Sequence, residues 1–471
     1  MNKFSIFFTL SILILIIACD KEDNSSLPEP APEACIQLSD TIVPVGEVVE
    51  FLSCSQNSNS VLWILSGIDS FEMEQFTYSF DTPGVKDITL VAENNSGDQK
   101  YSFASITVTG EEGKIYGEPD LTNNYYPQDI VSTPNQGFLV TYRLWPSVGS
   151  NEQSQLRIVA LDANVEFKNS FVLQVGGANP LYSDILNLSN GKIGITWSDY
   201  ISGYSGGYFG SLESDLSSSE INTLNPSGMQ LGFKGLIEKE KILYNFGFQG
   251  DNYDYELFIR KTELDGTFIE TKTISKSDTS LVPYKMVPTE DNGFVIAGLI
   301  NTNIGSQDIT KEIAFILKVD ANFNIIWEKY FGVKDQFEQI HYLLETSDGI
   351  LFSYGYNDNL YFQNISPDGK KVVEHTIDVV LSNTEGDIID FGSGYLIATG
   401  STLLKTDYQF NIISKKFLNS RSKAIRIIKR IEGGFALLMD QAIRNAEHNI
   451  SPSNIYIVKL DESGEVEYFQ N

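Results

Sequence analysis

One short unit recurs along most of this chain, and an internal repeat constrains the fold more strongly than any other feature of a sequence. Its first piece is a turn followed by an apolar strand, as in residues 290–296, where Asp-Asn-Gly precedes Phe294. We count seven copies of this piece, which begin near residues 134, 189, 238, 290, 347, 392 and 432. The repetition predicts a single repeat domain over residues 114–471.

A second piece alternates strictly with the first. It is a strand, an Asp-centred turn and another strand, clearest in residues 315–329 around Asp320. The other copies centre on Asp162, Asp215, Asp265, Asp368, Asp407 and Asp461. Four-stranded units repeated around an axis form a β-propeller, so we predict an all-β fold with about seven blades in residues 114–471. We expect the repeated Asp side chains to stabilise turns rather than to catalyse.

The copies resemble bacterial propeller repeats that read DGGF…AG and then KlDsnGnxxWxkxfG, most closely in residues 291–332. The third copy departs from this pattern, because Glu240 and Lys241 stand where a turn glycine is expected. Closure of the ring stays open at this point. Residues 114–117 and residues 465–469 could each supply the outermost strand of the last blade.

Residues 34–110 have the short, alternating strands of a small antiparallel sandwich, at 48–52, 61–65, 86–91 and 102–108. Trp63, together with residues 78–84 and 88–94, resembles a PKD domain, although the Gly-Asp-Gly of that family is replaced at residues 66–69. The resemblance implies an Ig-like spacer or adhesion module whose Trp packs in the core. We therefore expect Trp63 to be buried.

The first 18 residues have the marks of a secretory signal: one basic residue, a short apolar run over 4–17 and the small Ala18. The apolar run is too short to cross a bilayer comfortably as a helix. Cys19 after Ala18 resembles the lipobox of bacterial lipoproteins, and the acidic residues 20–23 resemble the surface-export signal of Bacteroidetes-type bacteria. These resemblances imply lipid attachment at Cys19, an outer-membrane location facing the cell exterior and membrane contact through the lipid alone.

Residues 19–33 hold the lipidated Cys and a proline-rich stretch, which favours an extended tether. If Cys19 carries lipid, Cys35 and Cys54 remain as a disulfide pair, and the alternative is two buried free thiols on neighbouring strands. The net charge of −29 argues against nucleic acid as a partner, because phosphate binding depends on Lys and Arg.

The sequence contains little that points to catalysis. The three His residues lack metal-ligand spacing, and residues 203–207 match G-x-S-x-G only within a glycine- and tyrosine-rich stretch that we expect to be a loop. We therefore assign no catalytic residue and no cofactor, with calcium as the one exception. Its candidate ligands are Asp251, Asp254 and Glu256, and the alternative is a group of solvated loop acids.

Long aromatic connections between second and third strands are the main functional signal. Rings beside Asn, Gln and Asp suit sugars, whose C–H faces stack while their hydroxyls form hydrogen bonds. The alternative is that the rings anchor their own loops. The candidate ligand-binding residues are Trp145, Tyr200, Tyr204, Tyr208, Phe248 and Tyr253.

Together these features predict an exported lipoprotein that binds a glycan or another protein, without catalysis, through the loop-rich face of its propeller. One alternative is a carboxylate-dependent polysaccharide hydrolase or lyase, which needs an acidic pocket at the propeller axis. A second alternative is a structural component of an outer-membrane complex, which needs a broad apolar patch on one rim.

Overall fold

The computed structural model describes residues 29–65, 69–80, 82, 84–109, 113–116, 123–146, 154–173, 179–201, 204–217, 219–223, 230–251, 254–277, 279–301, 312–331, 340–356, 359–370, 372–377, 386–418, 422–442 and 453–469. Every regular element in these ranges is a β-strand, and none of them contains a helix that is long and apolar enough to span a membrane. The predicted signal and Cys19 lie outside the described residues. The chain divides into two compact units, one within Met1–Gly110 and one within Glu111–Phe469.

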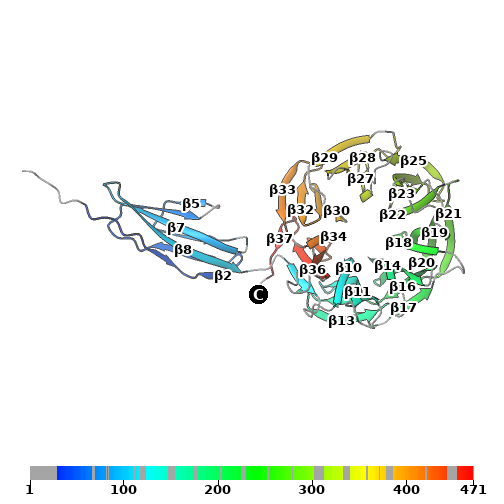
Figure 1. Cartoon of the computed structure of the whole chain (residues 1–471), viewed down its shortest axis with the longest axis horizontal. Coiled ribbons are helices and arrows are strands. Elements are labelled where there is room, and N and C mark those ends of the chain that lie inside the picture. Colours follow the sequence, from blue (N-terminus) through cyan, green and yellow to red (C-terminus); the bar gives the residue numbers. More distant parts are fainter. Residues whose placement is uncertain are drawn as a thin grey trace, which may run out of the picture. The chain divides into compact units, whose positions relative to one another are not determined.

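The first unit is a sandwich of two sheets (Figure 1), with strand orders β1-β3-β6 and β2-β8-β7-β4-β5. Its strands are β1 (Ile36–Leu38), β2 (Ile42–Pro44), β3 (Val48–Ser53), β4 (Ser60–Leu65), β5 (Asp69–Phe71), β6 (Gln75–Ser79), β7 (Gly84–Glu93) and β8 (Gln99–Thr109). Trp63 is fully buried between them, edge-on to Phe51 and Phe76, and its Nε1 donates a hydrogen bond to the Met73 carbonyl at 2.9 Å. The expectation that Trp63 belongs to the core is confirmed.

Two contacts hold the N-terminal segment of the described chain against the sandwich. Cys35 and Cys54 are joined by a disulfide, with their Cα atoms 4.8 Å apart. The Glu29 carboxylate accepts hydrogen bonds from the backbone amide and the hydroxyl of Ser96, both at 3.1 Å. Glu29 belongs to the predicted tether, so the described end of that tether lies against the sandwich.

The second unit contains, within its described residues, seven antiparallel sheets (Figure 1), as predicted. Six of them have four strands, and the last has a fifth strand paired to its third. The first strand of each sheet lies nearest the axis: β10 (Asn123–Ser132), β14 (Asn179–Asn187), β18 (Gln230–Lys239), β22 (Ser280–Pro288), β26 (Ile340–Thr346), β30 (Gly386–Asp390) and β34 (Ser422–Lys429). The second strands are β11 (Phe138–Pro146), β15 (Ile193–Ile201), β19 (Ile242–Asp251), β23 (Phe294–Asn301), β27 (Gly349–Tyr356), β31 (Tyr395–Thr399) and β35 (Phe435–Ala442).

The third strands of the blades are β12 (Gln155–Leu161), β16 (Tyr204–Leu212), β20 (Asp254–Glu263), β24 (Glu312–Val319), β28 (Asn359–Ile365), β32 (Thr402–Thr406) and β36 (Ser453–Leu460). The outermost strands are β13 (Phe167–Val172), β17 (Ser219–Thr223), β21 (Phe268–Ile274), β25 (Ile325–Phe331), β29 (Val372–Ile377), β33 (Ile412–Phe417) and β37 (Val466–Glu467). Each pair of neighbouring blades shares one cluster of buried apolar side chains, so the core of the propeller is a ring of seven inter-blade cores in the described part of the chain.

Both candidate closing segments take part in the last blade. The strand β9 (Gly113–Tyr116) pairs with Ile455–Val458 of β36, and β37 pairs with Lys459 and Leu460 of the same strand. The two segments therefore divide the outer edge of β36 between them. The ring is closed by strands from both ends of the repeat domain.

The repeated Asp residues stabilise turns, as predicted. In all seven Asp-centred turns the Asp carboxylate accepts a hydrogen bond from the backbone amide two residues later, at 2.8–3.1 Å. The third copy, which lacks the turn glycine, keeps its hairpin because Glu240 and Lys241 both adopt positive φ angles, 53° and 64°. Two consecutive residues with positive φ are the requirement of a type I′ turn.

Two of the three aromatic connections are shorter than predicted, and residues 203–207 are not wholly a loop. Strand β15 ends at Ile201 and β16 begins at Tyr204, while β19 ends at Asp251 and β20 begins at Asp254. Gly206, Gly207 and Gly250 lie within strands instead. A Cβ on Gly207 would stand 2.0 Å from the Phe233 ring of the next blade, so a glycine is needed there for blade packing.

Candidate functional site

The seven inner strands carry mostly polar or charged side chains at equivalent positions, each just before a buried apolar residue. The equivalent residues are Asp129, Asp184, Gly235, Lys285, Tyr342, Asp387 and Arg426, and the residues that follow are 92% or more buried. An inner strand is a sheet edge, and its unpaired backbone groups face the axis. Charged side chains on these strands are therefore concentrated around the axis.

Three of the Asp carboxylates bond the backbone of the next blade. Asp129 accepts a hydrogen bond from the Ile185 amide at 3.0 Å, and Asp184 accepts one from the Leu236 amide at 2.7 Å. Asp387 accepts a longer one from the Ile427 amide at 3.4 Å. Each carboxylate thus satisfies an amide on the exposed edge of its neighbour, which links adjacent blades.

Arg426 lies between two of these carboxylates, with its Nε 3.3 Å from Asp129 and 3.4 Å from Asp387. The charge of Asp129 raises the pKa of Arg426, with Asp387 and Asp184 adding to the effect, so the guanidinium stays charged. Burial raises the pKa of Asp184 well above its usual range, and the neighbouring, hydrogen-bonded Asp129 raises it further. Asp184 therefore holds its proton more strongly than an ordinary carboxyl group.

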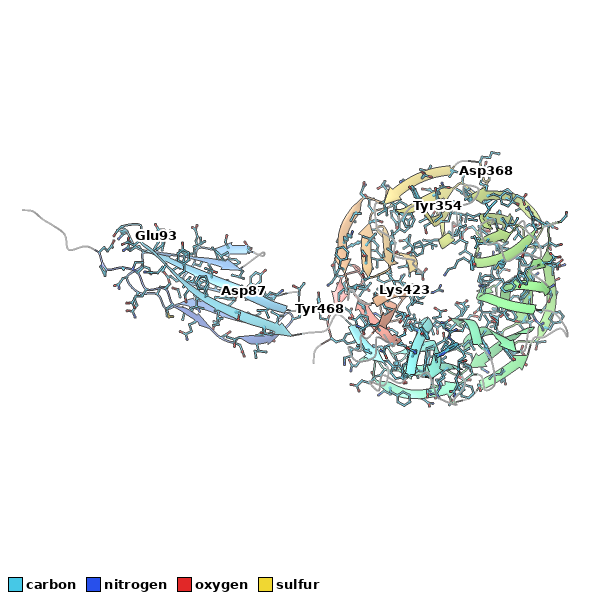
Figure 2. All side chains as sticks on the ribbon, in the orientation of Figure 1. Asp87, Glu93, Tyr354, Asp368, Lys423 and Tyr468 are labelled. Carbon is cyan, nitrogen blue, oxygen red and sulfur yellow. A yellow bond between two sulfur atoms is a disulfide. The ribbon has the colours of Figure 1, made fainter. Side chains whose placement is uncertain are left out.

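Two cavities open along the axis. One, of about 590 Å³, is lined by residues from the beginnings of inner strands, such as Tyr126 and Lys423, and from the ends of β11 and β35. It opens on the face that carries the second-to-third strand connections, and we name it the loop-side cavity. Figure 2 shows Lys423 toward the axis, whereas Asp368 lies at the rim. The other, of about 750 Å³, lies at the ends of the inner strands, and we name it the turn-side cavity.

The loop-side cavity has a charge balance opposite to that of the whole chain. Lys and Arg number 33 in the protein against 62 Asp and Glu. The walls of this cavity carry five cationic side chains, Arg143, Lys234, Lys285, Lys423 and Arg426, against three carboxyl groups, Asp129, Asp184 and Asp440.

Bulges aim side chains into this cavity. The pairing register shifts in six of the seven inner strands, and four of the bulged residues, Gln128, Lys234, Tyr284 and Ile425, line the loop-side cavity. A bulge re-aims the side chain of the extra residue, and bulges are over-represented next to functional sites. The local irregularity of the inner strands is thus what places polar side chains in the cavity wall.

Lys234 lies against two aromatic rings where the two cavities meet. Its Nζ is 4.8 Å from the centre of the Tyr284 ring and 5.7 Å from that of Phe248. Burial lowers the pKa of Lys234 to about 7. Cation–π contacts of this kind hold an ammonium in place where little water reaches it.

Arg143 lies in a second cation–π cluster, on blade one. Its guanidinium carbon is 5.2 Å from the centre of the Tyr126 ring and 4.9 Å from that of Trp145, and burial lowers the pKa of Arg143. Trp145 is 38% exposed at the end of β11. The partly exposed Trp ring therefore contacts a residue of the cavity wall.

The six candidate ligand-binding residues do not form one group. Trp145 and Phe248 contact the cavity-lining cations Arg143 and Lys234. Tyr208 stacks on Trp197 at 5.2 Å within blade two, as expected of a ring that anchors its own strand. The backbones of Tyr200 and Tyr204 belong to β15 and β16, and Tyr253 lies outside the described residues.

The calcium candidates lie at the hairpin between β19 and β20. The backbones of Asp251 and Asp254 pair directly across the two strands, and Glu256 pairs with Gln249 two residues further along. In the part of the chain that the structure describes, no three His, Cys, Asp or Glu side chains are grouped so that they could hold a metal ion.

Neither the charge of the chain nor any motif identifies the axial residues, but the sequence contains a weak recurring pattern. A charged residue followed by two apolar ones recurs a few residues before the turn pieces, at 129–131, 184–186, 285–287, 387–389 and 426–428. That pattern identifies axial positions once the inner strand of the repeat is known. The bulges that orient Lys234 and Tyr284 have no comparable signal in the sequence.

Among solved structures, the chain is similar to several propeller proteins. A quinonprotein alcohol dehydrogenase-like protein from Bacteroides thetaiotaomicron is 11% identical, with 90% of this chain and 92% of that chain covered and a TM-score of 0.41. The NanB sialidase of Streptococcus pneumoniae is 9% identical, with 92% of this chain and 93% of that chain covered and a TM-score of 0.41. An α-L-arabinofuranosidase from Fusarium graminearum is 9% identical, with 74% of this chain and 98% of that chain covered and a TM-score of 0.45.

At these identities and TM-scores, no activity or ligand is carried over to this chain. No protein-family model matches the sequence, and no curated protein matches it. The geometry of the axial site is therefore the basis for assigning a function.

Proposed function

We propose that this protein is an exported, lipid-anchored surface protein that binds a glycan, without catalysis, in the loop-side cavity of its propeller. The observation that carries the proposal is the wall of this cavity, where hydrogen-bonding charged groups adjoin aromatic rings. Tyr126, Tyr284 and Gln128 line the cavity together with the charged side chains, and Trp145 contacts the cavity-lining Arg143. Rings that stack on sugar C–H faces and polar groups that bond hydroxyls are the combination that saccharides require.

The acidic groups on the axis favour binding over glycoside cleavage. Asp129 is paired with Arg426, and the nearby Asp129 helps to raise the pKa of Asp184, so neither group is placed as a separate acid and base flanking a bound sugar. Both are also engaged with backbone amides of the next blade. Their contacts support a structural role in the cavity wall.

The anchor is the part of the proposal that explains where the cavity works. The lipobox-like Ala18-Cys19 and the acidic residues 20–23 support attachment of the mature chain to the outer membrane, facing outward. The sandwich and the tether then act as a spacer between the lipid and the propeller.

Binding can be tested with a glycan array and the purified full-length protein. We expect binding to at least one class of saccharide, and we expect Trp145→Ala to weaken it about fivefold, because a lost stacking contact is worth about 1 kcal/mol. Phe417→Ala, which removes a ring that is 67% exposed on the outermost strand β33, is the matched control and should leave binding unchanged. Failure to bind any saccharide would reject the proposal.

A further inference from the structure

We infer that the saccharide held in the loop-side cavity is anionic, carrying carboxylate or sulfate groups that the cationic wall recognises. This inference rests on the proposed function and adds the chemical class of the ligand. It begins from the charge count: five cationic side chains against three carboxyl groups in a protein whose acids outnumber its bases almost two to one. A local inversion of this size is not expected from the composition of the chain.

The contacts of the three carboxyl groups leave the inversion in place, because the ion pair of Asp129 with Arg426 removes one group of each sign. Asp129 is engaged with Arg426 and with the Ile185 amide, and Asp184 accepts the Leu236 amide. Asp440 accepts a hydrogen bond from the Ser453 hydroxyl. These acids are therefore held by the propeller itself, while the cations Arg143 and Lys234 are packed on aromatic rings.

The positions of the cations suit a ligand that enters from the loop face. Arg143 and Lys423 lie near the ends of strands at that face, whereas Lys234, Lys285 and Arg426 also line the turn-side cavity and so lie deeper. A guanidinium presents a planar fork that matches a carboxylate, and an ammonium is a compact point charge. A cavity of about 590 Å³ is within the size range of small-molecule sites, so it admits a short charged segment of a glycan.

The test compares charged glycans with their own neutral derivatives. The probes are an oligogalacturonide and its methyl ester, a sialylated oligosaccharide and its desialylated form, and a sulfated oligosaccharide and its desulfated form. We expect the full-length protein to bind the charged member of at least one pair tenfold or more tightly, with affinity falling severalfold between 50 and 300 mM salt. The pair that responds distinguishes carboxylate from sulfate as the recognised group.

Variants assign the preference to the cavity. Lys285→Gln and Arg143→Gln should reduce the affinity for the charged member about tenfold and leave its neutral counterpart unchanged, while Lys285→Arg should retain binding. Lys370→Gln removes a charge whose side chain is 84% exposed in the turn after β28, and it should have no effect. Thermal melting of each variant reports whether the propeller remains folded.

The failures of the two proposals are distinguishable. If neutral members bind as tightly as charged ones, or if Lys285→Gln weakens both equally, the anionic ligand is rejected and the glycan site stands. If no member of any pair binds but the glycan array shows binding of another, neutral saccharide, only the anionic ligand is rejected. If the array also shows no binding, both proposals are rejected.

Discussion

At the scale of single residues, one side-chain type has two opposite roles in this protein. An Asp in a blade turn is exposed and accepts several hydrogen bonds, which lower its pKa, as at Asp320 and Asp407. An Asp on the axis is buried next to another acid, and the pKa of Asp184 rises as a result. The sequence predicted the first role, because the turn is local, and missed the second, because Asp129 and Asp184 belong to different blades.

The turn Asp residues should make the folded protein less stable in acid. Their folded-state pKa values lie below the unfolded value near 4, reaching about 2 for Asp368, where the Ser366 hydroxyl contributes most. This stabilisation is present above about pH 4 and is lost as the pH falls toward 2. At Asp320 the hydrogen bonds from Asn324 contribute most to the lowered pKa.

Asp320→Asn keeps an acceptor oxygen but cannot be ionised, so it isolates the charged contribution. We expect the variant to melt about 1–2 °C below the natural protein at pH 7 and the difference to shrink toward zero at pH 2.5. The measurement is melting temperature against pH for both proteins. A difference that stays constant across this range would show that the ionised Asp320 does not stabilise the turn.

At the scale of elements, the hairpins within each blade were predictable, whereas the pairing of two different strands with one edge of β36 was not. The turn and strand pieces of the repeat correspond to hairpins, and even the copy with Glu240 and Lys241 keeps its turn. Residues 114–117 and 465–469 looked like rivals for one place, yet β9 and β37 each pair with a different part of β36. A sequence pattern describes one strand at a time, so it does not indicate that two strands divide an edge.

Removing the Tyr116 side chain should weaken the closure of the ring by β9. Its ring contacts Tyr125 and Tyr142 and stacks on Phe167 at 6.2 Å. Tyr116→Ala should lower the free energy of unfolding by about 1–3 kcal/mol, because half-buried ring contacts between β9 and blade one are lost. Hydrogen exchange should also become faster at Ile455–Val458, which pair with β9.

Tyr116→Phe is the matched control, since it keeps the ring and removes only the hydroxyl. We expect it to retain the protection of β36. Unchanged exchange in Tyr116→Ala would mean that β9 does not close the ring through this contact.

At the scale of the whole molecule, the distribution of charge separates two environments. The chain carries a net charge of −29, yet the loop-side cavity is lined by more cations than acids. Composition alone predicted an acidic, soluble exterior and argued against nucleic acid. It did not predict a cationic site, because five residues from four different blades meet only when seven blades close around one axis.

The lipid anchor is a whole-molecule prediction that a single substitution tests. Cys19→Ala should abolish incorporation of labelled palmitate and move the protein from the membrane fraction to the soluble fraction, because the anchor is expected to be the lipid alone. Cys54→Ser, which removes a cysteine of the disulfide instead, controls for loss of a cysteine elsewhere in the chain and should leave the label in place. Retained label in Cys19→Ala would remove the anchor from the proposed function.

The sequence by itself determined the architecture, because a repeat with local turns specifies the same hairpins wherever it occurs. It predicted the number of blades, the structural role of the turn Asp residues and the burial of Trp63. The tertiary structure alone decided the contents of the axis. Residues 129 and 426 meet through ring closure, and bulges turn Lys234 and Tyr284 inward. Such contacts depend on register and on the packing of neighbouring blades, which no single repeat encodes.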